Sequence, residues 1–334
     1  MITKRLSDDI GGIKEAAEIL KSGGTVAVPT ETVYGLAASA FDEDAIKRVF
    51  IAKGRPQDNP LIVHISDMDM LLEVVADVPP IAKVLAEKFW PGPLTMVLPK
   101  GDKIPFSVCA GLDSVAVRMP SNEVAHNVIK CAGLPLAAPS ANTSGSPSPT
   151  KASHVLSDLD GKIDAAMQSG DCTVGVESTV LTLCTQPPRL LRPGGVTAEQ
   201  LREYIPDLEV DTAVFTEPEK DKPVASPGMK YKHYSPKTEI IMVETERFSE
   251  FMKDKEFCGA LCFFEEESEL SCPHIAYGSG ARPESLAEGL FSALRAADTL
   301  GVSTVYAHAP KKSGVALAVY NRLIRAAAFR VIKF

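Results

Sequence analysis

The chain has 334 residues, of which 45% are hydrophobic and 23% charged, and its formal net charge is −8. These proportions are typical of a globular protein, and the acidic balance argues against broad electrostatic binding of nucleic acid, though not against a local basic patch. No apolar run reaches the ~18 residues of a membrane helix, and the N-terminal residues MITKRLSDDIGG lack the apolar core of a signal peptide. We therefore expect a cytoplasmic protein with no membrane association.

The cysteines do not indicate a metal site or a disulfide framework. They are seven in number and form no CxxC pair, whereas a structural zinc site needs closely spaced Cys and His ligands. We expect free thiols in a reducing compartment and no protein-bound metal.

The first half of the chain begins with a strand, a helix and a second strand. Thr25 to Val28 is a short strand ended by a proline. Residues 42–53 then form a helix, with Asp42 as its N-cap and Gly54 in the left-handed turn that ends it. In the next strand, Leu61 to Ile65, the alternation of side chains places Ile62 and His64 on one face.

The pattern of alternating elements continues to about residue 208. Because the strands are many and short, it predicts an α/β or α+β domain with a strongly curved sheet. Further strands are expected at Leu94–Leu98, Val115–Met119, Leu136–Ala138, Ser178–Leu183 and Arg189–Leu191, and helices near residues 12–22, 80–89, 122–131, 150–158 and 197–204.

Composition divides the rest of the chain. Residues 209–237 lose periodicity and gain Pro, Lys and Glu, as linkers do. Residues 238–334 alternate again, which predicts a small Rossmann-like parallel-sheet domain. Its strands are expected at Glu239–Val243, Gly259–Phe264 and Thr304–Ala307, and its helices at residues 284–300 and 314–329. We therefore predict two domains, residues 1–208 and 238–334, joined by that linker.

Cations stand beside prolines and glycines at the ends of several expected strands. The chain has no GxxxxGK[ST] or GxGxxG loop, no GxSxG turn and no HExxH. It does have Arg55, Arg118 and Arg192 in such rigid places, where a guanidinium can bind a carboxylate or phosphate bidentately. With Lys53 they could balance a triphosphate and a small acid. Spacing alone favours surface or ion-paired arginines and a structural core role for His64. For Ser140 and Asn142 it allows turn-capping roles equally.

Taken together, the segments PTETVYGL, KGRPQDNPLIVH, FWPGPLT, VAVRMP, APSAN, GVESTV and LLRPG resemble those of the YrdC-type threonylcarbamoyl-AMP synthases. They occur in that order over most of residues 20–196. The segment SPGMKYKHYSP, residues 226–236, resembles the linker of the long, two-domain form of the family. The resemblance implies a twisted, largely open α/β sheet with a concave basic face in the first domain.

The resemblance also implies an activity and a set of site residues. The family joins L-threonine, bicarbonate and ATP into threonylcarbamoyl-AMP with release of pyrophosphate. The product feeds the t6A37 modification of tRNA by downstream transferase machinery. Mg²⁺ is expected to arrive with ATP. By resemblance, Lys53, Arg55 and Arg118 would be catalytic; Thr32, His64, Arg118, Ala138 and Ser178 would bind threonine; and Lys53, Arg55, Asn59, Ser114, Ser140, Asn142, Ser148, Arg192 and Tyr231 would bind ATP.

Further expectations concern the linker and competing functions. The cationic, aromatic residues 230–234 suggest a lid that closes over the cleft and excludes water from a labile product. One alternative is a double-stranded RNA-binding module without catalysis, because a concave basic face also suits a duplex. Weak binding of duplex RNA or tRNA is compatible with the synthase as well. A second alternative is a carbamoyl-phosphate-dependent transferase or maturation factor, which usually carries zinc-finger cysteines that this chain lacks.

Overall fold

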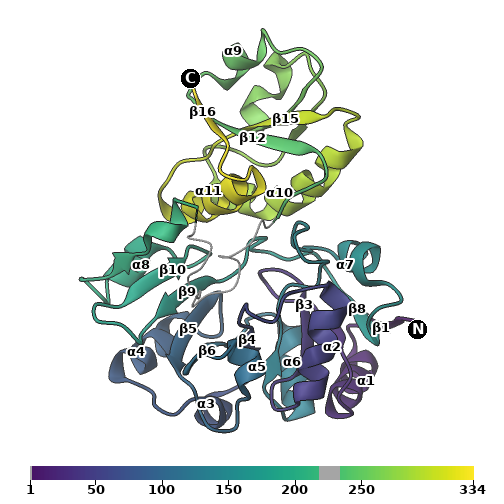
Figure 1. The fold of residues 1–334 in the computed structure, drawn as a ribbon, viewed down its shortest axis with the longest axis vertical. Helices are drawn as coiled ribbons and strands as arrows, with labels where there is room; N and C mark the ends of the chain where they lie inside the picture. The colour runs from purple at the N-terminus through teal and green to yellow at the C-terminus, as the bar shows by residue number, and fades with distance from the viewer. Residues whose placement is uncertain (1, 218–233) are drawn as a thin grey trace.

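The structure consists of two units with separate β-sheets. A computed structural model describes residues 2–217 and 234–334, which we call the first and second units. Figure 1 shows the second unit standing on the first, with helices α10 and α11 at the junction. The predicted α/β class, with a large sheet and a second, parallel-sheet domain, is confirmed. In these residues no helix has the length and apolar character needed to cross a membrane.

The first unit is built on one mixed sheet of eleven strands. In spatial order they run β1-β8-β2-β3-β7-β4-β6-β5-β9-β10-β11. Their bounds are β1 (Lys4–Ser7), β2 (Val26–Val28), β3 (Gly35–Ser39), β4 (Ile62–His64), β5 (Leu94–Pro99), β6 (Ser114–Arg118), β7 (Leu136–Ala137), β8 (Ala165–Gln168), β9 (Thr179–Thr182), β10 (Arg189–Arg192) and β11 (Glu209–Val210).

Helices and their caps frame this sheet. The Asp42 side chain accepts hydrogen bonds from the first-turn amides of α2, and Gly54 ends that helix at φ 59°, as the sequence predicts. The helices are α1 (Ile10–Lys21), α2 (Glu43–Lys53), α3 (Met68–Val74), α4 (Pro80–Phe89), α5 (Phe106–Cys109), α6 (Glu123–Ala132), α7 (Ala152–Leu159) and α8 (Ala198–Arg202), with the 3₁₀ turn η1 (Thr212–Val214) after β11.

Strand register brings polar side chains together in the middle of the sheet. His64 ends β4 and pairs with Arg118, the last residue of the parallel strand β6. On its other side Arg118 pairs with Thr95 of the antiparallel strand β5. Three side chains that are far apart in the sequence therefore lie at adjacent register positions.

Several strands of the first unit are not evident in the sequence. β3 has the sequence GLAAS and is buried along its whole length, and β8 has the sequence AAMQ. Glycine and alanine have low β-propensity, and neither segment shows an apolar–polar alternation. These strands form because the small side chains let neighbouring strands and helices pack closely, which is a tertiary effect.

The second unit is an all-parallel sheet covered by helices. Its five strands lie in the order β14-β13-β15-β12-β16, and every pairing is parallel. The elements are β12 (Glu239–Glu244), α9 (Phe248–Met252), β13 (Gly259–Cys262), η2 (Phe264–Glu269), β14 (His274–Ala276), α10 (Pro283–Ala296), η3 (Ala297–Thr299), β15 (Thr304–His308), α11 (Gly314–Ala326) and β16 (Val331–Lys333). The strands β14 and β16 and the helix α9 are additions to the sequence prediction.

The two units share a packed junction. Val33 and Val176 of the first unit belong to the same apolar cluster as the buried faces of α10 and α11. Gly175 lies against α10 with φ 75°, and a Cβ there would be 2.4 Å from the Ala287 carbonyl oxygen. The half-buried pair Arg295–Asp158, at 2.8 Å, also crosses the junction.

The chain beyond the predicted first domain begins as part of the large sheet. β11 pairs with β10, so the sheet extends to Val210. The domain limits at 208 and 238 stay a prediction. The predicted lid falls largely on residues 218–233, which lie outside the described residues.

Candidate active site

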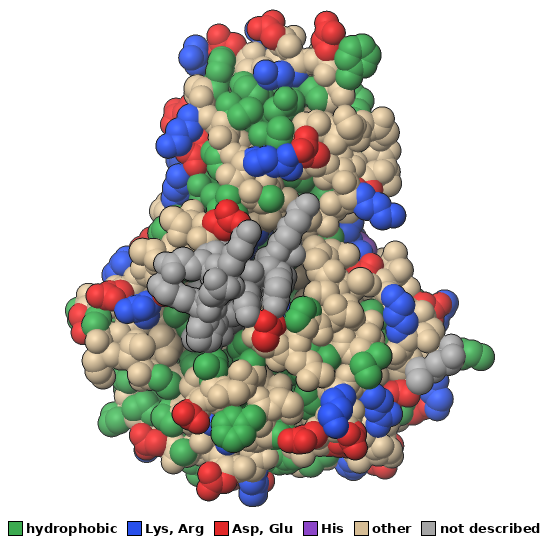
Figure 2. Space-filling view, in the orientation of Figure 1, with side chains coloured by type: hydrophobic (Ala, Val, Ile, Leu, Met, Phe, Trp, Pro, Cys, Tyr) green, Lys and Arg blue, Asp and Glu red, His purple; other side chains and the backbone are tan. Residues whose placement is uncertain are grey.

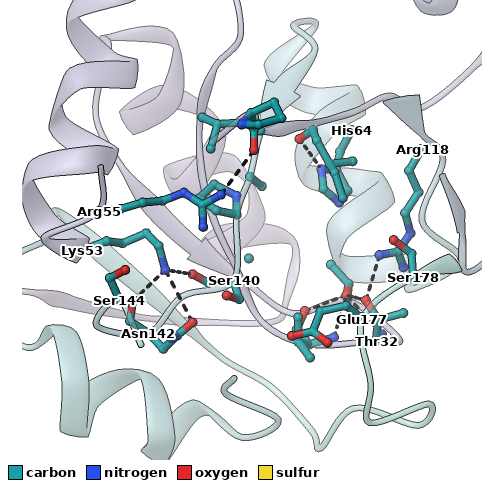
Figure 3. A pocket seen from close by; sticks show the side chains of 18 of the residues that line it. Thr32, Lys53, Arg55, His64, Arg118, Ser140, Asn142, Ser144, Glu177 and Ser178 are labelled. Atoms are coloured by element: carbon teal, nitrogen blue, oxygen red, sulfur yellow. Dashed lines mark hydrogen bonds between the residues drawn. The ribbon is translucent and has the colours of Figure 1, made fainter. Parts of the chain in front are cut away.

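Most of the predicted site residues line one pocket of the first unit, on the side facing the second. Figure 3 shows two groups of side chains on opposite sides of it: one around Lys53, which we call the Lys53 end, and one around Arg118, which we call the Arg118 end. The predicted residues that line the pocket are Thr32, Lys53, Arg55, His64, Arg118, Ala138, Ser140, Asn142, Ser178 and Arg192.

Arg118 is held in place by three neighbours. Its Nη1 donates to Thr32 Oγ1 at 2.8 Å and its Nε donates to the Gly92 carbonyl at 3.2 Å. Its Nη2 lies 2.6 Å from Glu31 Oε1, without the alignment of a hydrogen bond. Both side chains of this pair are buried. The guanidinium is therefore oriented before any ligand arrives.

The charge of Glu31 depends on Arg118. Burial by itself would raise the pKa of Glu31, but the Arg118 charge outweighs it and holds that pKa below the ordinary value. Glu31 is thus a carboxylate that offsets one of the cations of the site. It stands in the PTETVYGL segment, yet sequence reasoning gave it no role.

His64 is a neutral imidazole at the Arg118 end. Burial, and then the Arg118 charge, lower the pKa of His64 to about 3. Its Nδ1 lies 3.2 Å from the Ile62 carbonyl oxygen, which can only accept, so Nδ1 carries the proton. The Nε2 atom is then a hydrogen-bond acceptor.

Ser178 links the Arg118 end to the β9–β10 region. Its hydroxyl shares a 2.7 Å hydrogen bond with Thr95. Arg192 donates to the Ser178 carbonyl at 3.0 Å and to the Ser178 hydroxyl at 3.2 Å. Burial, together with a second guanidinium from Arg322, lowers the pKa of Arg192 to about 10, so Arg192 is still a cation at neutral pH.

At the other end, Lys53 holds a loop. Its Nζ donates to the backbone carbonyls of Ser140 and Asn142 and lies 3.4 Å from Asn142 Oδ1. The Ser144 amide in turn donates to the Lys53 carbonyl at 2.8 Å. Burial, and then the Arg55 charge, lower the pKa of Lys53 well below its ordinary value, whereas three oxygen acceptors favour its protonated form.

Arg55 and Asn59 follow α2 in the loop that leads to β4. Arg55 Nη2 donates to the Pro60 carbonyl at 3.3 Å. Asn59 is 1% exposed, and within the described chain neither atom of its side-chain amide has a hydrogen-bond partner. Since buried amides are normally paired, this one has capacity for a ligand contact. Asn59 itself is not among the lining residues.

Three further predicted residues have different positions. Ser148 does not line the pocket, but its hydroxyl donates to Glu177 Oε1, and Glu177 does line it. Ser114 begins β6, where it pairs with Pro99 of β5, and it is not among the residues that line the pocket. Tyr231 lies outside the described residues.

The structure also adds residues that sequence reasoning missed. Glu177 lies in the quoted GVESTV segment but was given no role, and Tyr234 was included only in the predicted lid cluster, residues 230–234. Tyr234 is buried, lines the pocket, and packs its ring 5.3 Å from that of Phe291 in α10. The second unit therefore contacts the pocket wall directly.

The pocket offers cations, hydroxyls and amides rather than a metal centre. Over residues 2–217 and 234–334, no group of three or more His, Cys, Asp or Glu side chains could hold a metal ion. Such a set of residues is suited to binding an anionic substrate and orienting it.

Comparison with known proteins agrees with this geometry. The family model described as telomere recombination, which covers Sua5, YciO and YrdC, matches residues 18–194. The model for the C-terminal domain of threonylcarbamoyl-AMP synthase matches residues 196–328. The threonylcarbamoyl-AMP synthase of Pyrococcus abyssi is 44% identical over 96% of this chain and 95% of its own length. That of Bacillus subtilis is 44% identical over 99% of this chain and 97% of its own.

Solved structures of the same family have a similar fold. Sua5 of P. abyssi, crystallised with L-threonine, has a TM-score of 0.91 and 40% identity, and the match covers 100% of both chains. YciO of E. coli, at a TM-score of 0.52 and 22% identity, shares the fold of 58% of this chain. These relatives match nearly the whole chain and therefore both units. The chain therefore belongs to the YrdC-type threonylcarbamoyl-AMP synthase family, in its long form with a C-terminal Sua5 domain.

Proposed function

We propose that this protein synthesises threonylcarbamoyl-AMP from L-threonine, bicarbonate and ATP, with release of pyrophosphate, and so acts as a nucleotidyltransferase. The observation that carries the proposal is the two-ended pocket. One end has a buried, preoriented arginine among hydroxyls, and the other has a lysine, an arginine and a polar loop. A small amino acid and a nucleotide can thus meet in one site.

The Arg118 end suits threonine. The Arg118 guanidinium can bind the amino-acid carboxylate, and the hydroxyls of Thr32 and Ser178 stand next to it. His64 Nε2 can accept a hydrogen bond from the amine or hydroxyl of threonine. Ala138, a lining residue with a small side chain, leaves room for the ligand. Threonine is also what P. abyssi Sua5 holds in its crystal structure.

The Lys53 end suits ATP. Lys53 and Arg55 supply positive charge, and Ser140 and Asn142 supply hydroxyl and amide groups beside it. Arg192, which lines the same pocket and donates to Ser178, adds a third cation. Asn59, with its unpaired amide in the loop after Arg55, and Ser114 are further candidates for ATP binding, and Ser148 joins the set through Glu177. Mg²⁺ would enter as part of the ATP substrate, since it keeps water and phosphate ligands readily.

The proposed reaction needs positioning more than a covalent nucleophile. The neutral amine of threonine forms a bond to the carbon of CO₂ from bicarbonate and loses a proton, which gives an N-carboxylate. An oxygen of that carboxylate then attacks the α-phosphorus of ATP, and the bond to the β-phosphate oxygen breaks to release pyrophosphate. Arginine and lysine side chains neutralise the charge that develops on the phosphates.

The biological role that we propose is to supply the t6A37 modification of tRNA through a downstream transferase. Duplex RNA binding as the main function has less support. The net charge is −8, and acidic and basic side chains are interspersed over the face in Figure 2. A cytoplasmic location stays a prediction.

Pyrophosphate release tests the proposal. It should be measured with ATP and Mg²⁺ while threonine and bicarbonate are each added or omitted. We expect release only when both are present. Release without threonine would indicate a plain pyrophosphatase, and no release from folded protein that binds duplex RNA would favour the RNA-binding alternative.

A further inference from the structure

A second, smaller cavity lies beside the Arg118 end of the active-site pocket. It has a volume of about 20 Å³, which is room for roughly one small molecule, since a single water needs about 10–15 Å³. Thr30, Gly35, His64 and Ala138 line both the cavity and the pocket, so the two spaces adjoin at these residues. The other lining residues are Val28, Ala37, Ala125, Ile129 and Leu136.

The sheet and helix α6 enclose this cavity. His64 of β4 pairs with Leu136 of β7, so these two side chains lie on the same face of the sheet. Ala125 and Ile129 are about one turn apart in α6, and both are buried. The cavity therefore lies between that face of the sheet and α6, next to His64.

The side chains around the cavity offer no proton to a ligand. Of the lining residues, all of which belong to the described part of the chain, only Thr30 and His64 have polar side chains. The Thr30 hydroxyl donates to the Val33 carbonyl at 2.6 Å, so its proton is committed. In His64 the proton stays on Nδ1, toward the Ile62 carbonyl, and Nε2 only accepts. The lining side chains therefore present one acceptor and no donor.

This chemistry discriminates between the forms of inorganic carbon. Bicarbonate is an anion, and an anion in an apolar space without hydrogen-bond donors loses far more solvation than a neutral molecule does. Water is also a poor occupant, because buried waters typically make about three hydrogen bonds and the lining side chains offer only His64 Nε2. CO₂ is small, uncharged and without a dipole, so it loses little on leaving water.

We propose that the cavity is a binding site for dissolved CO₂, and that the threonine amine attacks CO₂ taken directly from solution rather than bicarbonate. The inference rests on the proposed function, and it names the form of the carbon substrate. His64 and Arg118 occupy adjacent register positions. With its carboxylate on Arg118, threonine can donate a hydrogen bond from its amine to His64 Nε2, at the edge of the cavity. His64 thus holds the amine beside the carbon atom.

The step balances without a leaving group. The lone pair of the neutral amine forms a bond to carbon, one C–O π pair moves onto oxygen, and a nitrogen proton passes to water, which gives the N-carboxylate. Bicarbonate would have to lose its hydroxyl as water, and the side chains that line the cavity have no donor to protonate it. His64 orients the amine but does not keep the proton, because burial lowers the pKa of His64 to about 3.

Filling the cavity tests its role. Ala125→Val adds two methyl groups to a lining residue of α6. Ala132→Val is the matched control, because Ala132 is also buried in α6 but lines neither space. The measurements are the KM for inorganic carbon, threonine, serine and ATP in the full-length protein, together with thermal unfolding of each variant.

We expect Ala125→Val to raise the KM for inorganic carbon by roughly fivefold or more, and that for threonine by less than about twofold. Ala132→Val should change neither. A higher KM for threonine but not for serine, with inorganic carbon unaffected, would show that the cavity holds the threonine methyl group and would overturn the inference. Unchanged kinetics in a folded Ala125→Val protein would overturn it as well.

The wild-type protein supplies a second test, which does not depend on the folding of a variant. Hydration of CO₂ is slow without a catalyst. Labelled CO₂ and labelled bicarbonate are therefore mixed separately with excess enzyme, threonine and MgATP, and labelled product is measured before the two forms equilibrate. We expect several-fold more product from CO₂, and equal amounts once carbonic anhydrase is added.

More product from bicarbonate, or equal amounts without carbonic anhydrase, would contradict CO₂ as the substrate. No labelled product from either form would instead contradict the proposed function.

Discussion

The two ends of the pocket are held by different kinds of contact. At the Arg118 end a guanidinium is fixed by side chains from other elements, including a buried carboxylate, Glu31. At the Lys53 end an ammonium is fixed by backbone carbonyls of a loop. The first arrangement preorients a charge through an ion pair, and the second uses a charge to shape a loop. The same loss of a cation should therefore have different consequences at the two ends.

The largest expected effect follows removal of the cation at the Arg118 end. Arg118→Ala should lower kcat/KM for threonine by about 100-fold or more, because the carboxylate of threonine loses its partner. It should also lower the free energy of unfolding by roughly 3–5 kcal/mol, because Glu31 is left as an unpaired buried charge. Steady-state pyrophosphate release and denaturant unfolding measure the two effects.

The double variant Glu31→Gln, Arg118→Ala separates the effect on activity from the effect on stability. It should regain much of the stability and none of the activity. If Arg118→Ala alone were as stable as wild type, the ion pair would contribute nothing to the fold.

A smaller effect is expected at the Lys53 end. Lys53→Met should raise the KM for ATP by about tenfold, because the loop that carries Ser140 and Asn142 loses its anchor. Lys47→Met is the control on the same helix, since Lys47 is exposed and pairs with the exposed Asp44. Unchanged ATP kinetics in Lys53→Met would mean that the loop keeps its shape without the ammonium.

The pH dependence of stability should report His64. The unfolded residue binds a proton near pH 6.5, but the folded one does so only near 3. Between these values the unfolded state binds more protons, so stability is lost as the pH falls, at up to about 1.4 kcal/mol per pH unit. His64→Gln should flatten the curve from pH 6.5 to 5. An unchanged slope in His64→Gln would contradict a buried neutral imidazole.

The smallest expected effect concerns one hydroxyl. Thr95→Val removes the partner of the Ser178 hydroxyl and should cost about 1 kcal/mol, seen as a several-fold rise in the threonine KM. The KM for ATP should stay the same. A larger change for ATP than for threonine would show that Ser178 serves the nucleotide instead.

The sequence predicted the residues that line the pocket better than the strands of the sheet. Motif segments at the ends of strands and of α2 named Arg118, Lys53 and His64, and register then brings His64 and Arg118 to adjacent positions. Strands such as β3 could not be predicted, because buried alanines and glycines carry no periodic signal.

The contact of the second unit with the pocket wall could not be predicted from sequence motifs alone. Its parallel sheet follows from alternating elements, but Arg322 stands in a helix that reads as ordinary amphipathic sequence. Only the packing of α11 against the first unit reveals that this arginine meets Glu177, which is 145 positions away in the chain. Long-range ion pairs of this kind have no local sequence pattern.

The central claim is that one pocket joins threonine to AMP through a carbon from bicarbonate. Its most direct test is mass spectrometry of the adenylate formed from threonine, ATP and ¹³C-labelled bicarbonate. We predict a product that contains threonine, AMP and one labelled carbon, with pyrophosphate released in equal amount. An unlabelled threonyl adenylate, or AMP alone from the first turnover, would contradict the account.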